Sequence, residues 1–173
     1  WDLDGTGDYL SNASAPVTAT PLTMACWFNA DDATSNNSLV AVSDGTTGER
    51  FVLSARGNVA GDPIRAETSA APGTSVADTT TGFSASVWNH ACGVFAAANS
   101  RAAYLNGGSK GTNAGSRTPA GLNTLQLGGS GAATLVLAGL IAEAAVWNVA
   151  LSDDEVAILG RGSSPLHVRP ESI

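Results

Sequence analysis

Three carboxylates near the start of the chain could bind a metal ion. Asp2, Asp4 and Asp8 are interleaved with Gly5 and Gly7, and hard cations such as Ca²⁺ prefer oxygen-rich turns of this kind. The spacing is not that of the helix–loop–helix calcium loop, which also needs a bidentate glutamate further along the chain. A calcium site and a plain turn rich in aspartate and glycine both stay open, and a match this loose favours the plain turn.

A histidine and a cysteine could form a nucleophilic pair. His90 and Cys92 are two positions apart, and side chains two apart in a strand lie on the same face. A Cys–His pair is one interpretation. The other interpretation is a histidine at a sheet position whose hydrogen bonds are satisfied within the fold. Short motifs such as this one more often have the second, structural explanation. His167, the second of two histidines, lies near the C-terminus with no partner that the sequence identifies.

The two cysteines also allow two interpretations. Cys26 and Cys92 each lie in the middle of an alternating, strand-like segment. They could form a disulfide between two strands, or they could be two small buried thiols, as free cysteines commonly are. The sequence names no redox compartment, so both interpretations stay open.

Sugar binding usually needs an exposed aromatic ring beside polar side chains. Trp27, Trp88 and Trp147 lie in alternating segments at positions typical of a core, so we expect them to pack inside. Trp1 and Tyr9 are the aromatic residues that we expect to be exposed. No loop combines several aromatic residues with Asn or Asp, so the sequence does not locate a specific lectin site.

The elements that must position these side chains are mostly short strands. Residues 22–29 and 88–95 alternate between two faces, and Asn106-Gly107 predicts a hairpin turn. Residues 64–68 predict a weak, exposed strand, and residues 69–86 predict a long surface loop or an edge strand. About a dozen such strands at spacings of roughly 8–12 residues are typical of a β-sandwich or jelly roll.

A longer strand precedes the C-terminal region. Residues 139–147 alternate with apolar side chains on both faces, which indicates an inner strand. A regular alternation places Ile141, Glu143 and Trp147 on one face and Val146 on the other.

One short helix should follow this strand. Ser152 and Glu155 have the spacing of a capping box, which predicts a helix start. Gly160 suits a left-handed stop at the helix C-terminus. No other segment predicts a helix, and we expect residues 161–173 to be extended.

Length and charge exclude several classes of protein. The chain has 173 residues, a length typical of one domain with a sizeable core. Its net charge of −7 argues against nucleic acid and anionic membrane surfaces. No apolar run approaches the roughly 20 residues that a membrane-spanning helix needs, so we expect no membrane insertion.

Five segments together resemble a known family. In chain order they are LDGTGDYL (3–10), LTMACWFN (22–29), WNHACGVF (88–95), AAYLNGG (102–108) and the closing segment GLIAEAAVWNVALSDDEVAILGRG (139–162). They resemble, in the right order, laminin G-like (concanavalin A-like) domains. The resemblance implies an all-β, two-sheet antiparallel jelly-roll sandwich over residues 1–160, followed by an extended tail or connector over residues 161–173.

The resemblance also bears on the candidate sites. Relatives often hold calcium between a loop and the acidic position of the closing strand, which implies Glu143 as a partner of Asp2, Asp4 and Asp8. This chain departs from many relatives at Ala142, where they have aspartate. The glucanase branch carries its catalytic carboxylates as Glu-x-Asp-x-x-Glu on one strand. That spacing is absent here, so we expect no enzyme activity.

The fold hosts lectins, adhesive modules and enzymes, so function must be argued separately. The closing segment and tail are similar to laminin G-like domains of tailed-phage structural proteins, which implies a non-catalytic module that decorates or adheres on a virion. The alternative is a carbohydrate-binding lectin module of a secreted bacterial protein, with or without a dependence on calcium. The expected partner is a protein of a larger assembly or a cell-surface glycan. The expected location is a virion surface or the outside of the cell. A homo-oligomer such as a trimer is compatible with decoration.

Overall fold

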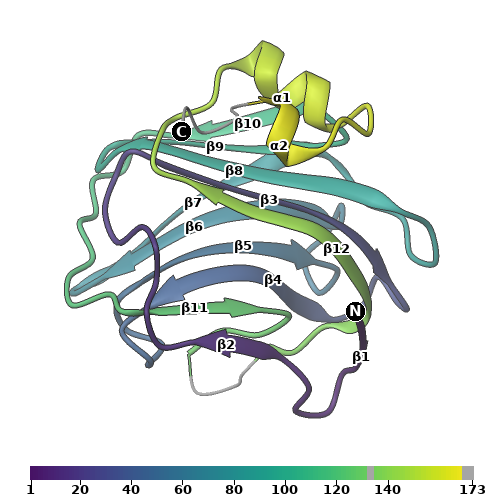
Figure 1. The fold of residues 1–173 in the computed structure, drawn as a ribbon, viewed down its shortest axis with the longest axis horizontal. Helices are drawn as coiled ribbons and strands as arrows, with labels where there is room; N and C mark the ends of the chain where they lie inside the picture. Colours follow the sequence, from purple (N-terminus) through teal and green to yellow (C-terminus); the bar gives the residue numbers. More distant parts are fainter. Residues whose placement is uncertain (132–134, 169–173) are drawn as a thin grey trace.

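The protein is a sandwich of two antiparallel sheets, shown by a computed structural model that describes residues 1–131 and 135–168 (Figure 1). Sheet A contains, in spatial order, β1 (Asp2–Asp4), β12 (Ala138–Trp147), β3 (Leu22–Ala30), β8 (Asn89–Ala97), β9 (Ser100–Leu105) and β10 (Gly108–Asn113). Sheet B contains β2 (Leu10–Asn12), β11 (Thr124–Leu127), β4 (Asn36–Ser43), β5 (Arg50–Arg56), β6 (Pro63–Ala70) and β7 (Gly73–Gly82). The predicted all-β jelly-roll sandwich is confirmed.

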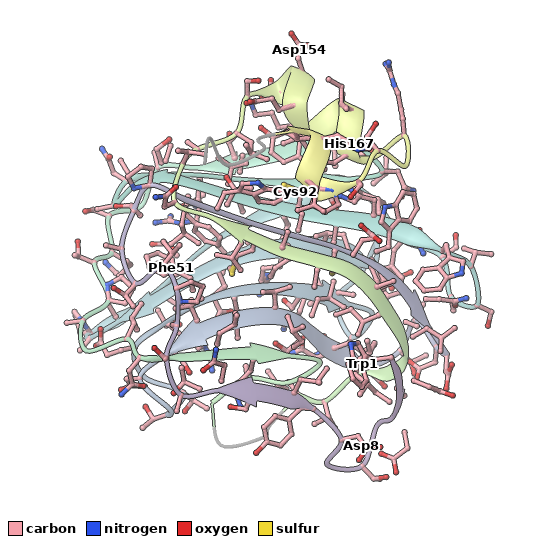
Figure 2. All side chains as sticks on the ribbon, in the orientation of Figure 1. Trp1, Asp8, Phe51, Cys92, Asp154 and His167 are labelled. Carbon is pink, nitrogen blue, oxygen red and sulfur yellow. The ribbon has the colours of Figure 1, made fainter. Side chains whose placement is uncertain are left out.

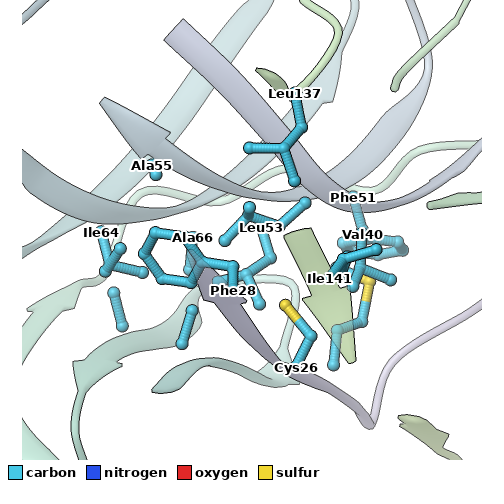
Figure 3. Packing of buried hydrophobic residues seen from close by; sticks show 14 of the residues in the cluster. Cys26, Phe28, Val40, Phe51, Leu53, Ala55, Ile64, Ala66, Leu137 and Ile141 are labelled. Carbon is cyan, nitrogen blue, oxygen red and sulfur yellow. The ribbon is translucent and has the colours of Figure 1, made fainter. Parts of the chain in front are cut away.

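The main core lies between the two sheets. The alternating apolar residues of β3 point into it, as the sequence predicts, and pack with apolar residues of sheet B such as Val40 and Leu53 (Figure 3). The rings of Phe51 and Phe95 meet edge to face, with centroids 5.1 Å apart. Phe28 meets Phe83 in the same way at 5.5 Å. Such pairs add to the stability that burial of the rings provides.

A second apolar cluster covers the outer face of sheet A. Helix α1 (Asp153–Leu159) buries Val156 and Leu159 against Cys92 and Tyr104, and the helices lie above this sheet in Figure 1. The predicted capping box is present, because the amide of Glu155 donates to Ser152 Oγ at 3.3 Å and the Ser152 amide donates to Glu155 Oε2 at 2.7 Å. Neither described helix has the length and apolar composition that would let it cross a membrane.

The end of this helix differs from the prediction. Gly160 has a φ of −66°, so it is right-handed, and the left-handed residue is Gly162 with a φ of 92°. A Cβ at position 160 would clash with the backbone of Gly107. Glycine is therefore needed at position 160 for close packing against the β9–β10 turn and not for a special dihedral.

The tail also differs from the prediction. Residues Pro165–Val168 form a short helix, α2, where we expected extended chain. Val168 packs at the edge of the outer cluster, so tertiary contacts favour the helical turn. Residues 169–173 of the predicted tail lie outside the described residues, and the division at residue 160 stays a prediction.

The alternation predicted for residues 139–147 is broken by a β-bulge. Ala142 of β12 pairs with Trp27 of β3, and Ala145 of β12 pairs with Ala25 of β3, so three steps along β12 match two steps along β3. Glu143, within this bulge, has a φ of +49°. The extra residue reverses the faces beyond it. Val146 therefore joins the main core with Ile141, and Trp147 lies on the outer face.

One other strand differs from its prediction, and the sequence does not predict another. β6 is an interior strand whose residues are mostly buried, because β5 and β7 flank it, so the exposed strand predicted for residues 64–68 is wrong. β10 forms in a segment too polar and glycine-rich to predict a strand, because it pairs with β9. β7 is an edge strand of sheet B, one of the two alternatives for residues 69–86.

Candidate functional site

The aspartates near the N-terminus lie on an exposed edge of the sandwich. Asp2 and Asp4 are the end residues of β1, and Asp8 lies on the loop between β1 and β2 (Figure 2). All three side chains are exposed. The Thr6 amide donates to Asp4 Oδ1 at 2.7 Å, and this bond holds the pKa of Asp4 below its usual range. The hydrogen bond from two residues further along is typical of an Asx turn, which matches the plain-turn interpretation.

Glu143 is exposed at the bulge of β12. Its Oε2 accepts one long hydrogen bond, 3.5 Å, from Ser164 Oγ. Within residues 1–131 and 135–168, no three His, Cys, Asp or Glu side chains are grouped as metal ligands, so the structure does not gather Asp2, Asp4 and Asp8 with Glu143. A calcium site at these residues stays a prediction.

The two cysteines lie on opposite faces of sheet A. Cys26 pairs with Ala91 in the ladder, and Cys92 pairs with Ala25. Directly opposed residues share a face, so Cys26 points into the main core and Cys92 points into the outer cluster. Both are free buried thiols, and burial raises the pKa of each. The structure corresponds to the second of the two interpretations, and side chains that point to opposite faces cannot form a disulfide without rebuilding the sheet.

His90 shares the outer face with Cys92, as predicted, but the pair is not activated. Burial lowers the pKa of His90 to about 4, so the ring is neutral near pH 7. Its Nδ1 has no hydrogen-bond partner among the described residues, and the ring lies 5.5 Å from that of Trp27. A thiolate needs a nearby cation, and a neutral imidazole does not supply one. His90 is therefore a packing residue, although one polar atom is unsatisfied.

The aromatic residues divide differently from the prediction. Trp1 and Tyr9 are exposed, at 74% and 39%, as expected. Trp88 is 47% exposed, so the prediction that it packs inside is wrong. It lies in the loop before β8, where the chain has not yet entered the sheet. Trp27 and Trp147 are half-buried on the outer face of sheet A, which α1 and α2 only partly cover.

A hollow of about 310 Å³, which we name the Trp1 hollow, lies beside the exposed indole. It is lined by Trp1, Leu127, Ile141, Ala142, Glu143 and Ala144. Trp1 is held by two backbone hydrogen bonds to Ile141, each 2.9 Å long. The bulge two residues later turns Glu143 into the lining, and bulges commonly re-aim side chains in this way. The hollow therefore combines an exposed indole, whose backbone is held to β12, with a carboxylate that makes one long hydrogen bond.

A larger hollow of about 640 Å³ lies between α1 and strands β8 to β10. Tyr104 Oη donates to Asp153 Oδ1 at 2.7 Å, and Lys110 Nζ donates to both oxygens of Asp153 at 2.7 and 2.9 Å. The bond from Lys110, followed by that from Tyr104, holds the pKa of Asp153 below its usual range. Tyr104 is only 3% exposed, so its ring cannot stack on a ligand. Lys110 and Asp153 are already paired with each other, and Arg101, which also lines this hollow, donates to Thr68, Asn113 and the Ala98 carbonyl.

Neither hollow has the carboxylate pair of a glycosidase. Among the residues that the structure describes, the Trp1 hollow is lined by one carboxylate, Glu143, and the larger hollow by one, Asp153. Glycoside hydrolysis normally needs two carboxylates that flank the bond to be broken. The Trp1 hollow can hold a ligand by stacking and hydrogen bonding, but it lacks this catalytic arrangement.

A family model described as "Concanavalin A-like lectin/glucanases superfamily" matches residues 4–157. The chain belongs to this superfamily. The match confirms the resemblance drawn from the five sequence segments. No curated protein matches the chain.

Solved structures similar to this member of the superfamily share its fold at low identity. Domain 4 of AbnA, an extracellular arabinanase from Geobacillus stearothermophilus, is 17% identical with a TM-score of 0.77, over 92% of this chain and 75% of the other. The sialidase module CBM40 of Ruminococcus gnavus is 17% identical with a TM-score of 0.66, over 87% and 98%. Domains LG4-5 of the mouse laminin α1 chain are 10% identical with a TM-score of 0.64, over 87% and 43%. None of these three is a virion protein, and virion decoration stays a prediction.

The sequence indicates only part of the Trp1 hollow. Exposure of Trp1 is predicted, and Glu143 is unusual as a carboxylate in an apolar strand. Leu127 and Ile141 carry no signal, because apolar residues that line a hollow cannot be distinguished by type from those of the core.

Proposed function

We propose that this domain is a non-catalytic, extracellular module that binds carbohydrate at the Trp1 hollow. The observation that carries the proposal is the exposed indole of Trp1, a residue whose backbone is bonded to β12, beside the weakly bonded carboxylate of Glu143. An indole supplies a rigid apolar surface for the C–H face of a sugar ring. A carboxylate accepts hydrogen bonds from sugar hydroxyls.

The size of the hollow sets the expected ligand. A volume of about 310 Å³ is at the lower end of the range for small-molecule sites, roughly 300–1,000 Å³. It suits one or two sugar units and not a long buried chain. We therefore expect weak binding, with a Kd on the order of 0.1–1 mM, because little surface is buried and few polar groups take part.

The similar structures support binding rather than catalysis. The arabinanase domain was solved with arabinotriose, and the sialidase module was solved with sialyllactose. Because the identities are below 20%, these structures do not specify which sugar this chain binds.

A glycan array followed by titration calorimetry tests the proposal. The array, probed with and without Ca²⁺, identifies a ligand and also tests the calcium prediction, and arabinotriose serves as the first soluble probe. Trp1→Ala should weaken binding at least tenfold, and Glu143→Gln should weaken it several-fold. Trp88→Ala is the matched control, because Trp88 is also exposed but does not line the Trp1 hollow. Binding that survives Trp1→Ala, or is lost equally in Trp88→Ala, would refute this site.

A further inference from the structure

Charged side chains gather on the outer face of sheet B. We name this surface the arginine patch; it consists of Arg50 and Arg56 of β5, Arg65 and Glu67 of β6, and Asp78 of β7. The residues that alternate with them point into the main core: Phe51, Leu53, Ala55, Ile64, Ala66 and Ala77. The patch has three cations and two carboxylates. It is therefore net positive, although the chain has a net charge of −7 and only eight Lys and Arg residues.

Both carboxylates of the patch are already paired. Arg50 donates to Glu67 Oε1 through Nε at 3.1 Å and through Nη2 at 2.7 Å. Arg65 forms a two-bond pair with Asp78, through Nε and Nη2, each at 2.6 Å. The side chains of Arg50, Glu67 and Arg65 are 10–16% exposed, so these pairs are partly shielded from water. Each pair neutralises itself and leaves no carboxylate for a third cation.

Arg56 is that third cation. Its Nε donates to Asn58 Oδ1 at 3.2 Å. In the described part of the chain, its guanidinium forms no salt bridge, and its two Nη atoms have no hydrogen-bond acceptor. Burial, followed by the charge of Arg65, lowers the pKa of Arg56. A half-buried guanidinium without a salt-bridge partner is unfavourable, and a bound anion would relieve this cost.

We propose that Arg56 binds the acidic group of a saccharide, either a carboxylate or a sulfate ester. The planar guanidinium fork can donate two parallel hydrogen bonds to either group. Asn36 faces Arg56 in the ladder, and Ser54 lies two residues before Arg56 on the same face of β5, so small polar residues lie next to Arg56. A nucleic acid is a poorer fit, because it needs many cations and the rest of this chain is acidic.

The proposed anion site is independent of the Trp1 hollow. Arg56 lies on β5, whereas the hollow is lined by β12 and by Leu127 of β11. In sheet B, β4 separates β11 from β5. The competing interpretation is that Arg56 only covers small residues with its apolar stem and points its charge to water. That interpretation predicts no binding of acidic sugars.

Titration by two-dimensional NMR tests the proposal with matched sugars. Methyl β-glucuronide and methyl β-glucoside differ only in the carboxylate, and glucose 6-sulfate provides the sulfate arm. We expect one or both acidic sugars to bind, with shifts at Arg56 and its neighbours, and the glucoside to bind at least tenfold more weakly. Raising the NaCl concentration from about 0.05 to 0.5 M should weaken acidic-sugar binding several-fold, because screening increases.

Variants separate the site from general electrostatics. Arg56→Met should weaken acidic-sugar binding at least tenfold, and Arg56→Lys should weaken it less, because the charge stays and the fork is lost. Arg161→Met removes the same charge from an exposed position outside the patch and should leave binding unchanged. Arg56→Lys also keeps the test valid if the methionine variant does not fold.

The proposal is overturned if neither acidic sugar binds, or if the glucoside binds as tightly as the glucuronide. It is also overturned if Arg56→Met and Arg161→Met weaken acidic-sugar binding equally. A fourth contrary result is that Trp1→Ala abolishes glucuronide binding while Arg56→Met leaves it unchanged. The last result would assign the acidic sugar to the Trp1 hollow. Conversely, glucuronide binding that persists in Trp1→Ala supports the arginine patch even if the Trp1 hollow binds no sugar.

Discussion

The buried ring of His90 should make the stability of this domain depend on pH in a defined window. His90 is 2% exposed, and burial lowers its pKa from 6.5 to about 4. The unfolded chain therefore binds a proton more readily than the folded one. The contribution of the neutral ring is fully present above about pH 6.5 and is lost as the pH falls toward 4.

The size of this effect follows from the two pKa values. A difference of about 2.5 pKa units corresponds to a maximum loss of about 3 kcal/mol at 1.36 kcal/mol per unit. At pH 5, the unfolded ring is almost fully protonated and the folded ring almost fully neutral, so the loss is about 2 kcal/mol. Asp4, Asp32 and Asp153 have pKa values below their usual range. Their contributions are lost mainly below pH 4, so the histidine window is separate.

Urea unfolding at pH 7.5 and pH 5 measures the effect. The wild-type free energy of unfolding should fall by about 2 kcal/mol between these pH values. His90→Phe keeps an aromatic ring beside Trp27 but cannot be protonated, so its stability should be nearly constant over this range. His167→Phe is the matched control, because His167 is exposed, and it should keep the wild-type dependence. The reasoning fails if His90→Phe loses as much stability as the wild type.

Two further predictions concern the sheets. Gly139→Ala should lower the free energy of unfolding, measured by urea unfolding, by about 3 kcal/mol or more. The reason is that Gly139 has a φ of +131° and that a Cβ at this position would clash with the Asn29 carbonyl oxygen. Gly108→Ala, where no atom lies within 4 Å of the added Cβ, is the control, and equal losses would contradict the argument. Cys26 and Cys92 should be unreactive toward a thiol-specific disulfide reagent in the native protein, and both thiols should react in urea, because they are free and fully buried. Rapid reaction of the folded protein would show that the outer cluster opens.

The sequence predicts elements whose conformation depends on near neighbours. The alternation of residues 22–29 predicts β3 and its inward face. Ser152 and Glu155 predict the start of α1, and Asn106-Gly107 predicts the β9–β10 turn, where both residues have positive φ values. In each case the residues that decide the conformation lie within a few positions of one another. Local chemistry is therefore sufficient.

Tertiary structure decides which side chains meet. The bulge at Glu143 arises from pairing with β3, and it reverses the faces of Val146 and Trp147. Gly160 is required by the turn at Gly107, more than fifty residues earlier in the sequence. These contacts depend on strand register, which a short segment does not encode.

The candidate sites follow the same division. Exposure of Trp1 is predictable from its sequence context, but the hollow beside it depends on the bulge that aims Glu143. Arg56 has no carboxylate partner in the arginine patch because Asp78 is paired with Arg65 across β6 and β7. The sequence determines the clearly alternating strands such as β3, the start of the capped helix and the supply of charged groups. Pairing between distant strands determines which charges are neutralised and which are left to bind a ligand.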